Sequence, residues 1–137
     1  MEQRKLKLAL QVVVSLTIAL LFHTFSSCSV QESNYYDLRI INSGRATNPI
    51  VTSEVFFQED SVKIYGAGII INEERSNNFT ADKETGVIKF ELNPGKYRFT
   101  GVGVHMKEIL TENVTLKQGD SLILMFYLPQ SDEVLIH

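Results

Sequence analysis

Hydrophobic and polar residues alternate along much of the chain after residue 35. The alternation is clearest over residues 36–40, 88–92 and 97–100, where every second position is apolar. A period of two places one face of a β-strand in a core and the other face in water. Further strand candidates are residues 51–57, 62–65, 68–71, 77–80, 109–116 and 121–128.

Clusters of turn-forming residues separate these candidate strands. They lie at residues 42–44, 58–60, 72–74, 84–86, 93–95 and 117–120. Short strands at this spacing, with no amphipathic helix pattern after residue 28, predict an all-β domain. We expect a single antiparallel β-sandwich of about seven to eight strands.

Residues 121–128 are apolar at nearly every position, so both faces of this candidate strand are apolar. A strand of that kind is stable in water only if both of its faces are covered. We therefore expect it to be the best protected strand. One face would meet the opposite sheet, and the other would be covered by the N-terminal tether, a loop or a partner.

The first 28 residues have the organisation of an export signal. Basic residues come first, at Arg4, Lys5 and Lys7, and an apolar run follows over residues 8–22. Small residues then precede a point of cleavage, as in secretory signal peptides. The apolar run is shorter than the ~20 residues of a membrane-spanning helix.

Cys28 is the single cysteine of the chain and follows Ser26 and Ser27. The segment resembles the lipobox of bacterial lipoproteins, with Ser27 as the small residue and Phe25 in place of the usual leucine. This resemblance implies a lipoprotein signal peptide over residues 1–27 and a diacylglyceryl group on Cys28. Two alternatives are an ordinary signal peptidase cut after Ser26 or Ser29, and an uncleaved anchor over the apolar run.

The domain plan that follows has a tether over residues 28–34 and one β-sandwich over residues 35–137. Ser29 stands where inner-membrane lipoproteins of enterobacteria carry a retaining aspartate. We therefore expect an exported protein anchored by lipid to the outer membrane, on its periplasmic face or at the cell surface.

The acidic net charge of the chain argues against nucleic acids and anionic lipid headgroups as its main partners. The chain has 13 basic and 16 acidic residues, with a net charge of −3, and three of the basic residues belong to the leader. Nucleic acids and anionic headgroups are bound by clustered Lys and Arg, which the rest of the chain lacks. One cysteine also excludes a disulfide within the chain and a cysteine-rich metal site.

The second half of the sequence resembles the carboxypeptidase regulatory-like domain. The resemblance covers roughly residues 62–128 and is most specific at Pro94-Gly95-Lys96-Tyr97, between two alternating strands. The other matching segments are Gly66-Ala67-Gly68 before an isoleucine run, Thr80-Ala81-Asp82, Thr85-Gly86, residues 112–116 and Gly119-Asp120. The resemblance implies an immunoglobulin/transthyretin-like β-sandwich, following the N-terminal signal helix. Residues 35–65 and the segment from Gly101 to His105 depart from the family pattern.

This resemblance implies a non-catalytic module, because such domains are appended to enzymes and outer-membrane receptors. His105 is the single histidine between the leader and the C-terminal residue, and a lone strand histidine is a poor candidate for a catalyst. Asp82 and Glu84 before Gly86 lack the ligand spacing of an EF-hand calcium loop and indicate a hairpin turn. The sequence therefore predicts no catalytic residue, no cofactor and no metal site.

Two pairs of adjacent aromatic residues, Tyr35-Tyr36 and Phe56-Phe57, are candidates for a binding surface. Neighbouring side chains of a regular strand point to opposite faces, so one ring of each pair would be exposed unless a bulge or a second layer covers it. We expect a binding or assembly module that acts on an envelope protein or glycan. The alternatives are a carbohydrate-binding surface domain and, third, a hydrolase of the transthyretin-like fold.

Overall fold

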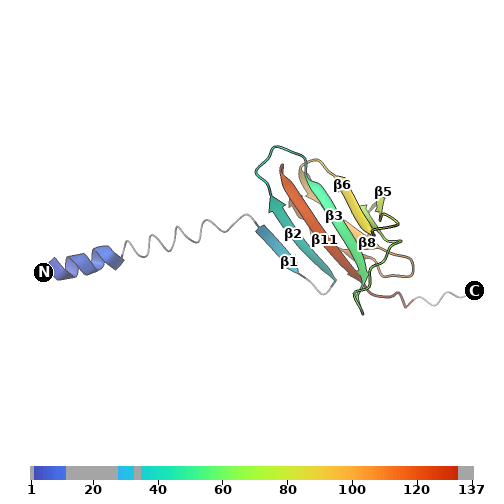
Figure 1. The fold of residues 1–137 in the computed structure, drawn as a ribbon, viewed down its shortest axis with the longest axis horizontal. Coiled ribbons are helices and arrows are strands. Elements are labelled where there is room, and N and C mark those ends of the chain that lie inside the picture. Colours follow the sequence, from blue (N-terminus) through green and yellow to red (C-terminus); the bar gives the residue numbers. More distant parts are fainter. Residues whose placement is uncertain (1, 12–27, 33–34, 133–137) are drawn as a thin grey trace, which may run out of the picture.

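The computed structural model describes residues 2–11, 28–32 and 35–132 of the chain. Residues 2–11 form a short helix, and the elements that follow are strands (Figure 1). Within the described ranges, no helix has the length and the hydropathy that a membrane crossing requires. Residues 12–22 of the leader's apolar run and the lipobox residues before Cys28 lie outside the described residues.

The strands form three open sheets (Figure 1). The largest has the order β1 (Cys28–Glu32), β2 (Tyr36–Asn42), β11 (Asp120–Leu128), β3 (Ile50–Phe57) and β6 (Val87–Glu91). The four-stranded sheet has the order β5 (Glu74–Thr80), β4 (Gly68–Ile71), β8 (Phe99–Val102) and β9 (Ile109–Leu110). A small third sheet pairs β10 (Val114–Leu116) with β7 (Gly95–Tyr97).

The all-β prediction is confirmed, but the expectation of a purely antiparallel arrangement is wrong at one place. Strand β11 lies between β2 and β3 and runs antiparallel to β2 and parallel to β3. A parallel pair needs a long crossover connection, and the chain between β3 and β11 supplies it, because it forms the strands of the other sheets on the way. The domain also has more strands than the expected seven to eight, since several are only two to four residues long.

Most predicted segments form strands, with shifted boundaries. The segment 77–80 is the end of a longer strand, β5, while 62–65 contributes only an isolated bridge between Phe56 and Lys63. Residues 28–34 were expected to be a tether, yet Cys28–Glu32 form β1 and pair with β2. Backbone hydrogen bonds along the exposed edge of β2 allow this pairing, which side-chain periodicity does not reveal.

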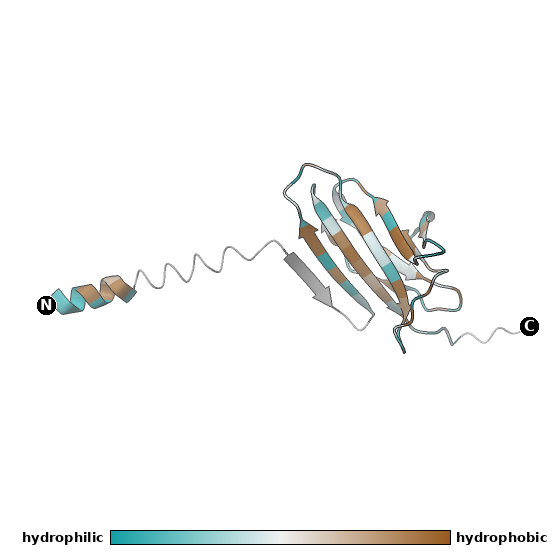
Figure 2. Ribbon diagram, viewed as in Figure 1, coloured by the Kyte–Doolittle hydropathy of each residue, from teal (hydrophilic) through white to brown (hydrophobic). Residues whose placement is uncertain are grey.

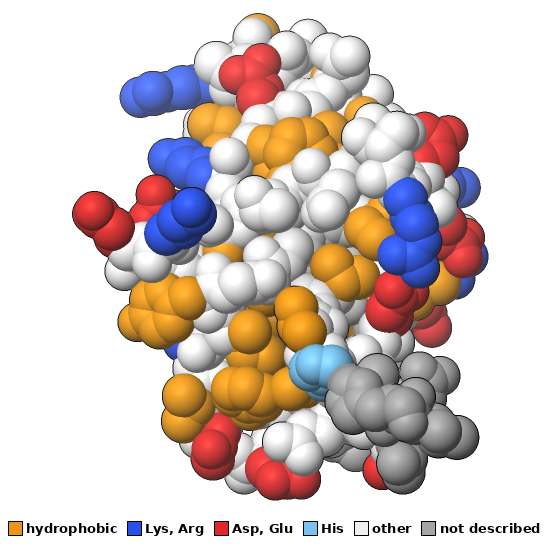
Figure 3. Space-filling model, turned by 90° about the vertical axis from the view of Figure 1, so that its right-hand side faces the viewer, with side chains coloured by type: hydrophobic (Ala, Val, Ile, Leu, Met, Phe, Trp, Pro, Cys, Tyr) orange, Lys and Arg blue, Asp and Glu red, His pale blue; other side chains and the backbone are white. Residues whose placement is uncertain are grey.

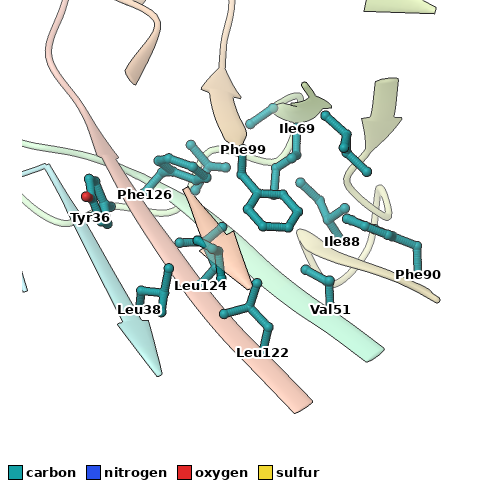
Figure 4. Close-up of a cluster of buried hydrophobic side chains, with 14 of the residues drawn as sticks. Tyr36, Leu38, Val51, Ile69, Ile88, Phe90, Phe99, Leu122, Leu124 and Phe126 are labelled. Carbon is teal, nitrogen blue, oxygen red and sulfur yellow. The ribbon is translucent and has the colours of Figure 1, made fainter. Parts of the chain in front are cut away.

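The core lies between the five-stranded and the four-stranded sheet. Four side chains of β11 point into it and are fully buried, as are Ile69 of β4 and Phe99 of β8 (Figure 4). The four are Leu122, Leu124, Phe126 and Leu128. Figure 2 shows hydrophobic residues recurring along the central strands of the five-stranded sheet. The prediction that one face of residues 121–128 packs against the opposite sheet is therefore confirmed.

Gly101 of β8 lies directly against the ring of Phe126 in the facing sheet. A Cβ atom at this position would lie 2.6 Å from Cγ of the fully buried Phe126 ring. A rigid aromatic ring packed on all sides has little room to move away. Glycine at this position is therefore required by packing.

We expect Gly101→Ala to destabilise the domain by roughly 1–3 kcal/mol, because the added methyl group overpacks the core. Equilibrium unfolding in urea measures the change. Gly66→Ala is the matched control, since a Cβ there meets nothing within 4 Å, and its free energy of unfolding should stay within about 0.5 kcal/mol of wild type. Equal effects of the two substitutions would contradict the assignment of Gly101 to the sheet interface.

Candidate functional site

The predicted lipid attachment residue, Cys28, is the first residue of edge strand β1. In the antiparallel register of β1 and β2, Cys28 lies opposite Ile41. The following strand residues are also paired, up to Glu32 opposite Asp37. A lipid on Cys28 would therefore join the domain directly at one end of the five-stranded sheet, without a free tether between them.

The two tyrosines proposed for a binding surface lie on different sides of the sheet. Tyr36 is 7% exposed and packs in the core, with its ring centroid 6.2 Å from that of Phe126. Tyr35 precedes the strand and is 43% exposed. Of this pair only Tyr35 can contact a ligand at the surface, as the alternation of side chains requires.

Phe56 lies on the outer face of the five-stranded sheet, the side away from the core. Its ring stacks on Tyr127, with centroids 5.6 Å apart and an interplanar angle of 23°. The backbone N–H of Tyr127 donates a 2.8 Å hydrogen bond to the carbonyl of Tyr35, so the backbone of Tyr35 lies next to Tyr127. We call Tyr35, Phe56 and Tyr127 the ring cluster.

Phe57 is separate from the ring cluster. It is half-buried at the end of β3, opposite Leu128 of β11. These two residues line a small cavity of about 120 Å³ together with residues of the following turn and Gln130. Of the four predicted residues, Phe56 thus neighbours Tyr127 through its ring and Tyr35 through its backbone, whereas Tyr36 and Phe57 lie elsewhere.

Charged groups surround the ring cluster. The Lys63 ammonium lies 6.0 Å from the centroid of the Phe56 ring, within the range of a cation–π contact, and pairs with the carboxylate of Glu54. The Tyr127 hydroxyl donates a 3.1 Å hydrogen bond to Oδ2 of Asp37. Partial burial, followed by this hydrogen bond and the negative charge of Asp37, raises the pKa of Tyr127 above its usual value.

The outer face of β11 is apolar, as residues 121–128 predicted, but no layer of described residues covers it. Ile123, Met125 and Tyr127 alternate with the buried leucines and Phe126, and each is half-buried by neighbours on the same face. Arg39 and Lys89 belong to the same row of the sheet as Ile123, on either side of it. The result is an apolar stripe with charged side chains on both flanks.

Tyr127 is not among the binding residues predicted from the sequence, although it is the partner of the Phe56 ring. The available signal was the two-faced apolar pattern of residues 121–128, which places alternate residues on the outer face. Pairing Tyr127 with Phe56 also requires the parallel register of β11 and β3. That register is a long-range property that the local pattern does not contain.

The two other residues weighed for chemistry, His105 and Asp82, lie in turns. His105 is exposed in a tight turn and has a left-handed backbone, with φ 59°. The Asp82 carboxylate accepts hydrogen bonds from the N–H groups of Glu84 and Thr85 and from the Thr85 hydroxyl. These bonds, first those from the backbone, lower the pKa of Asp82 and account for it as a turn residue.

No group of three or more His, Cys, Asp or Glu side chains in the described parts of the chain is arranged to hold a metal ion.

Figure 3 shows hydrophobic side chains reaching the surface between charged ones on the side of the domain where β5 and β6 lie. The large apolar residues that are more than half exposed in the described domain are Val62, Tyr65 and Val104.

Comparison of the sequence with models of known protein families and with curated proteins finds no match.

The contact between Tyr127 and Asp37 predicts how the domain responds to alkaline pH. The folded pKa of Tyr127 lies above the value of ~10 in an unfolded chain. Deprotonation therefore favours the unfolded chain, and the stabilisation from this tyrosine is present at neutral pH and lost as pH rises above ~10. Tyrosinate absorbance in the near ultraviolet measures the titration.

Tyr127→Phe keeps the stacked ring and removes the hydroxyl. Because the pKa of Tyr127 is raised, the tyrosinate absorbance lost from the titration curve should be that of its most alkaline part. Asp37→Asn should bring the titration of Tyr127 closer to its ordinary range, but only in part, because burial is the larger cause of the shift. If Tyr127→Phe removed the earliest part of the curve instead, the raised pKa of Tyr127 would be contradicted.

Proposed function

We propose that this protein is an exported, lipid-anchored binding module of the outer membrane, with a transthyretin-like β-sandwich related to the carboxypeptidase regulatory-like domain. The arrangement of two sheets around one core supports the sandwich. Two glycines of the matching segments lie in left-handed turns, whereas Gly95 of the Pro94-Gly95 pair begins β7 without a positive φ. Gly86 has a φ of 70° in the turn before β6, and Gly119 has a φ of 81° in the turn before β11.

The observation that carries the proposal is the position of Cys28 at the start of β1. A lipid on this residue holds the sheet at the membrane through a paired strand, since Cys28 lies opposite Ile41. The anchored domain then has a defined orientation. The end of the sheet with Asn42 and Asp120 is near the bilayer, and the end with the ring cluster is far from it.

The outer face of the five-stranded sheet supports a role in binding or assembly without chemistry. An apolar centre with a polar rim is the usual composition of a protein interface. Ile123 and Met125 supply the centre, while Arg39, Lys89 and Asp37 surround it. This composition favours an envelope protein over a glycan as the partner of this face.

Metabolic labelling with radioactive palmitate tests the proposed anchor. We expect the full chain, expressed in a Gram-negative host, to carry the label and to fractionate with the outer membrane. Cys28→Ala should lose both properties, whereas Ser29→Ala, the matched control next to it, should keep the label. Unlabelled, soluble wild-type protein that begins after residue 26 or 29 would contradict the proposal and indicate a freely secreted binding domain.

A further inference from the structure

Two isoleucines on the outer face of the five-stranded sheet are exposed in the single domain. Ile41 of β2 is 45% exposed and Ile50 of β3 is 38% exposed. Both lie opposite Ser121 of β11, one on each side of it, so the three residues form one row across the sheet. This row continues the apolar stripe of Ile123 and Met125 and widens it toward both flanks.

Each flank of the apolar stripe carries one acidic and one basic side chain. Asp37 and Arg39 lie two residues apart on β2, so they are on the same face of the sheet. On β3, the carboxylate of Glu54 pairs with the ammonium of Lys63. Among the described residues, no carboxylate forms an ion pair with Arg39. The β2 flank therefore has a cation that a partner can pair.

The lipid anchor limits how two copies of the chain can meet. Two copies with lipids in the same leaflet can be related by a two-fold axis only if this axis is normal to the membrane, because any other two-fold axis would turn one copy away from the bilayer. The orientation of the axis rests on the proposed function, in which the end of the sheet with Asn42 is near the bilayer and the ring cluster is far from it. The strands then run along the membrane normal, and the two-fold axis is parallel to β11.

We propose that the outer face of the five-stranded sheet binds a second copy of this chain, in a dimer with its two-fold axis along β11. This axis places β2 of each copy opposite β3 of the other copy. In the row that contains Ser121, Ile41 faces Ile50 of the second copy, and the symmetry repeats this contact. Ile123 and Met125 lie on the axis, where each faces the same residue of the second copy. Sheets that pack face to face in this way bury the side chains of their facing surfaces.

The charged flanks are complementary in the same arrangement. Because β2 of one copy lies over β3 of the other, Arg39 approaches Glu54 of the second copy. Asp37 approaches Lys63 of the second copy by the same geometry. Opposite charges at the rim of an interface favour one relative orientation of the partners. A sugar would need hydrogen-bonding groups at the centre of the face, and the side chains of Ile123 and Met125 supply none.

Site-specific photo-cross-linking in the envelope tests the dimer. The full chain is expressed in a Gram-negative host as two copies with different affinity tags, and p-benzoylphenylalanine replaces the exposed Lys89 at the rim of the outer face. We expect a cross-linked species that carries both tags. The same probe in place of the exposed Asn77, on edge strand β5 of the other sheet, is the control and should give no such species.

Ile41→Glu places a carboxylate against Ile50 of the second copy. We expect the two-tag species to fall at least about tenfold, because an unpaired charge in an apolar contact is strongly unfavourable. Val104→Glu, at a loop valine that is 74% exposed, is the matched control and should leave the two-tag species unchanged. Adding Ile50→Lys to Ile41→Glu should restore it, because each glutamate then faces a lysine of the second copy. This rescue separates loss of the dimer from loss of folding.

Palmitate labelling of the same samples reports on the anchor separately. A labelled chain without the two-tag species would overturn the dimer and leave the proposed function intact. The two-tag species in an unlabelled chain would support the dimer and overturn the anchor. The dimer is also overturned if the probe at position 89 cross-links only to another envelope protein, or if Ile41→Glu and Val104→Glu have equal effects.

Discussion

Strand β11 is the constraint on which the rest of the fold depends. It is hydrogen-bonded on both edges, to β2 in antiparallel and to β3 in parallel orientation, so its backbone polar groups are paired within the sheet. Its inward side chains, such as Leu124 and Phe126, have no exposed surface. They set the spacing to the four-stranded sheet, where Phe126 comes so close to β8 that only glycine fits at position 101.

The period of two in the sequence was sufficient to predict an all-β domain and the inward face of most strands. It could not predict which strands are neighbours, because side-chain alternation is the same for parallel and antiparallel pairs. The parallel pairing of β11 with β3 was missed for this reason. Strand β1 was missed because Cys28–Glu32 pair through their backbone along the edge of β2, and their sequence has no clear alternation.

The position of a candidate site residue could be predicted only where it depends on side-chain alternation within one strand. Alternation indicated that Tyr35 and Tyr36 would point to different sides, and Tyr36 is indeed in the core while Tyr35 is at the surface. The stacking of Phe56 on Tyr127 depends instead on the parallel register between two distant segments, β3 and β11.

Native-state hydrogen exchange of the backbone amides tests the central role of β11 most directly. Amides in a central strand with a buried face exchange only when the whole domain unfolds, whereas those of exposed edges exchange by local opening. We expect the amides of Leu122–Phe126 to be the slowest in the domain and those of edge strand β5 to be much faster. Exchange of the β11 amides at the rate of β5 would contradict the account.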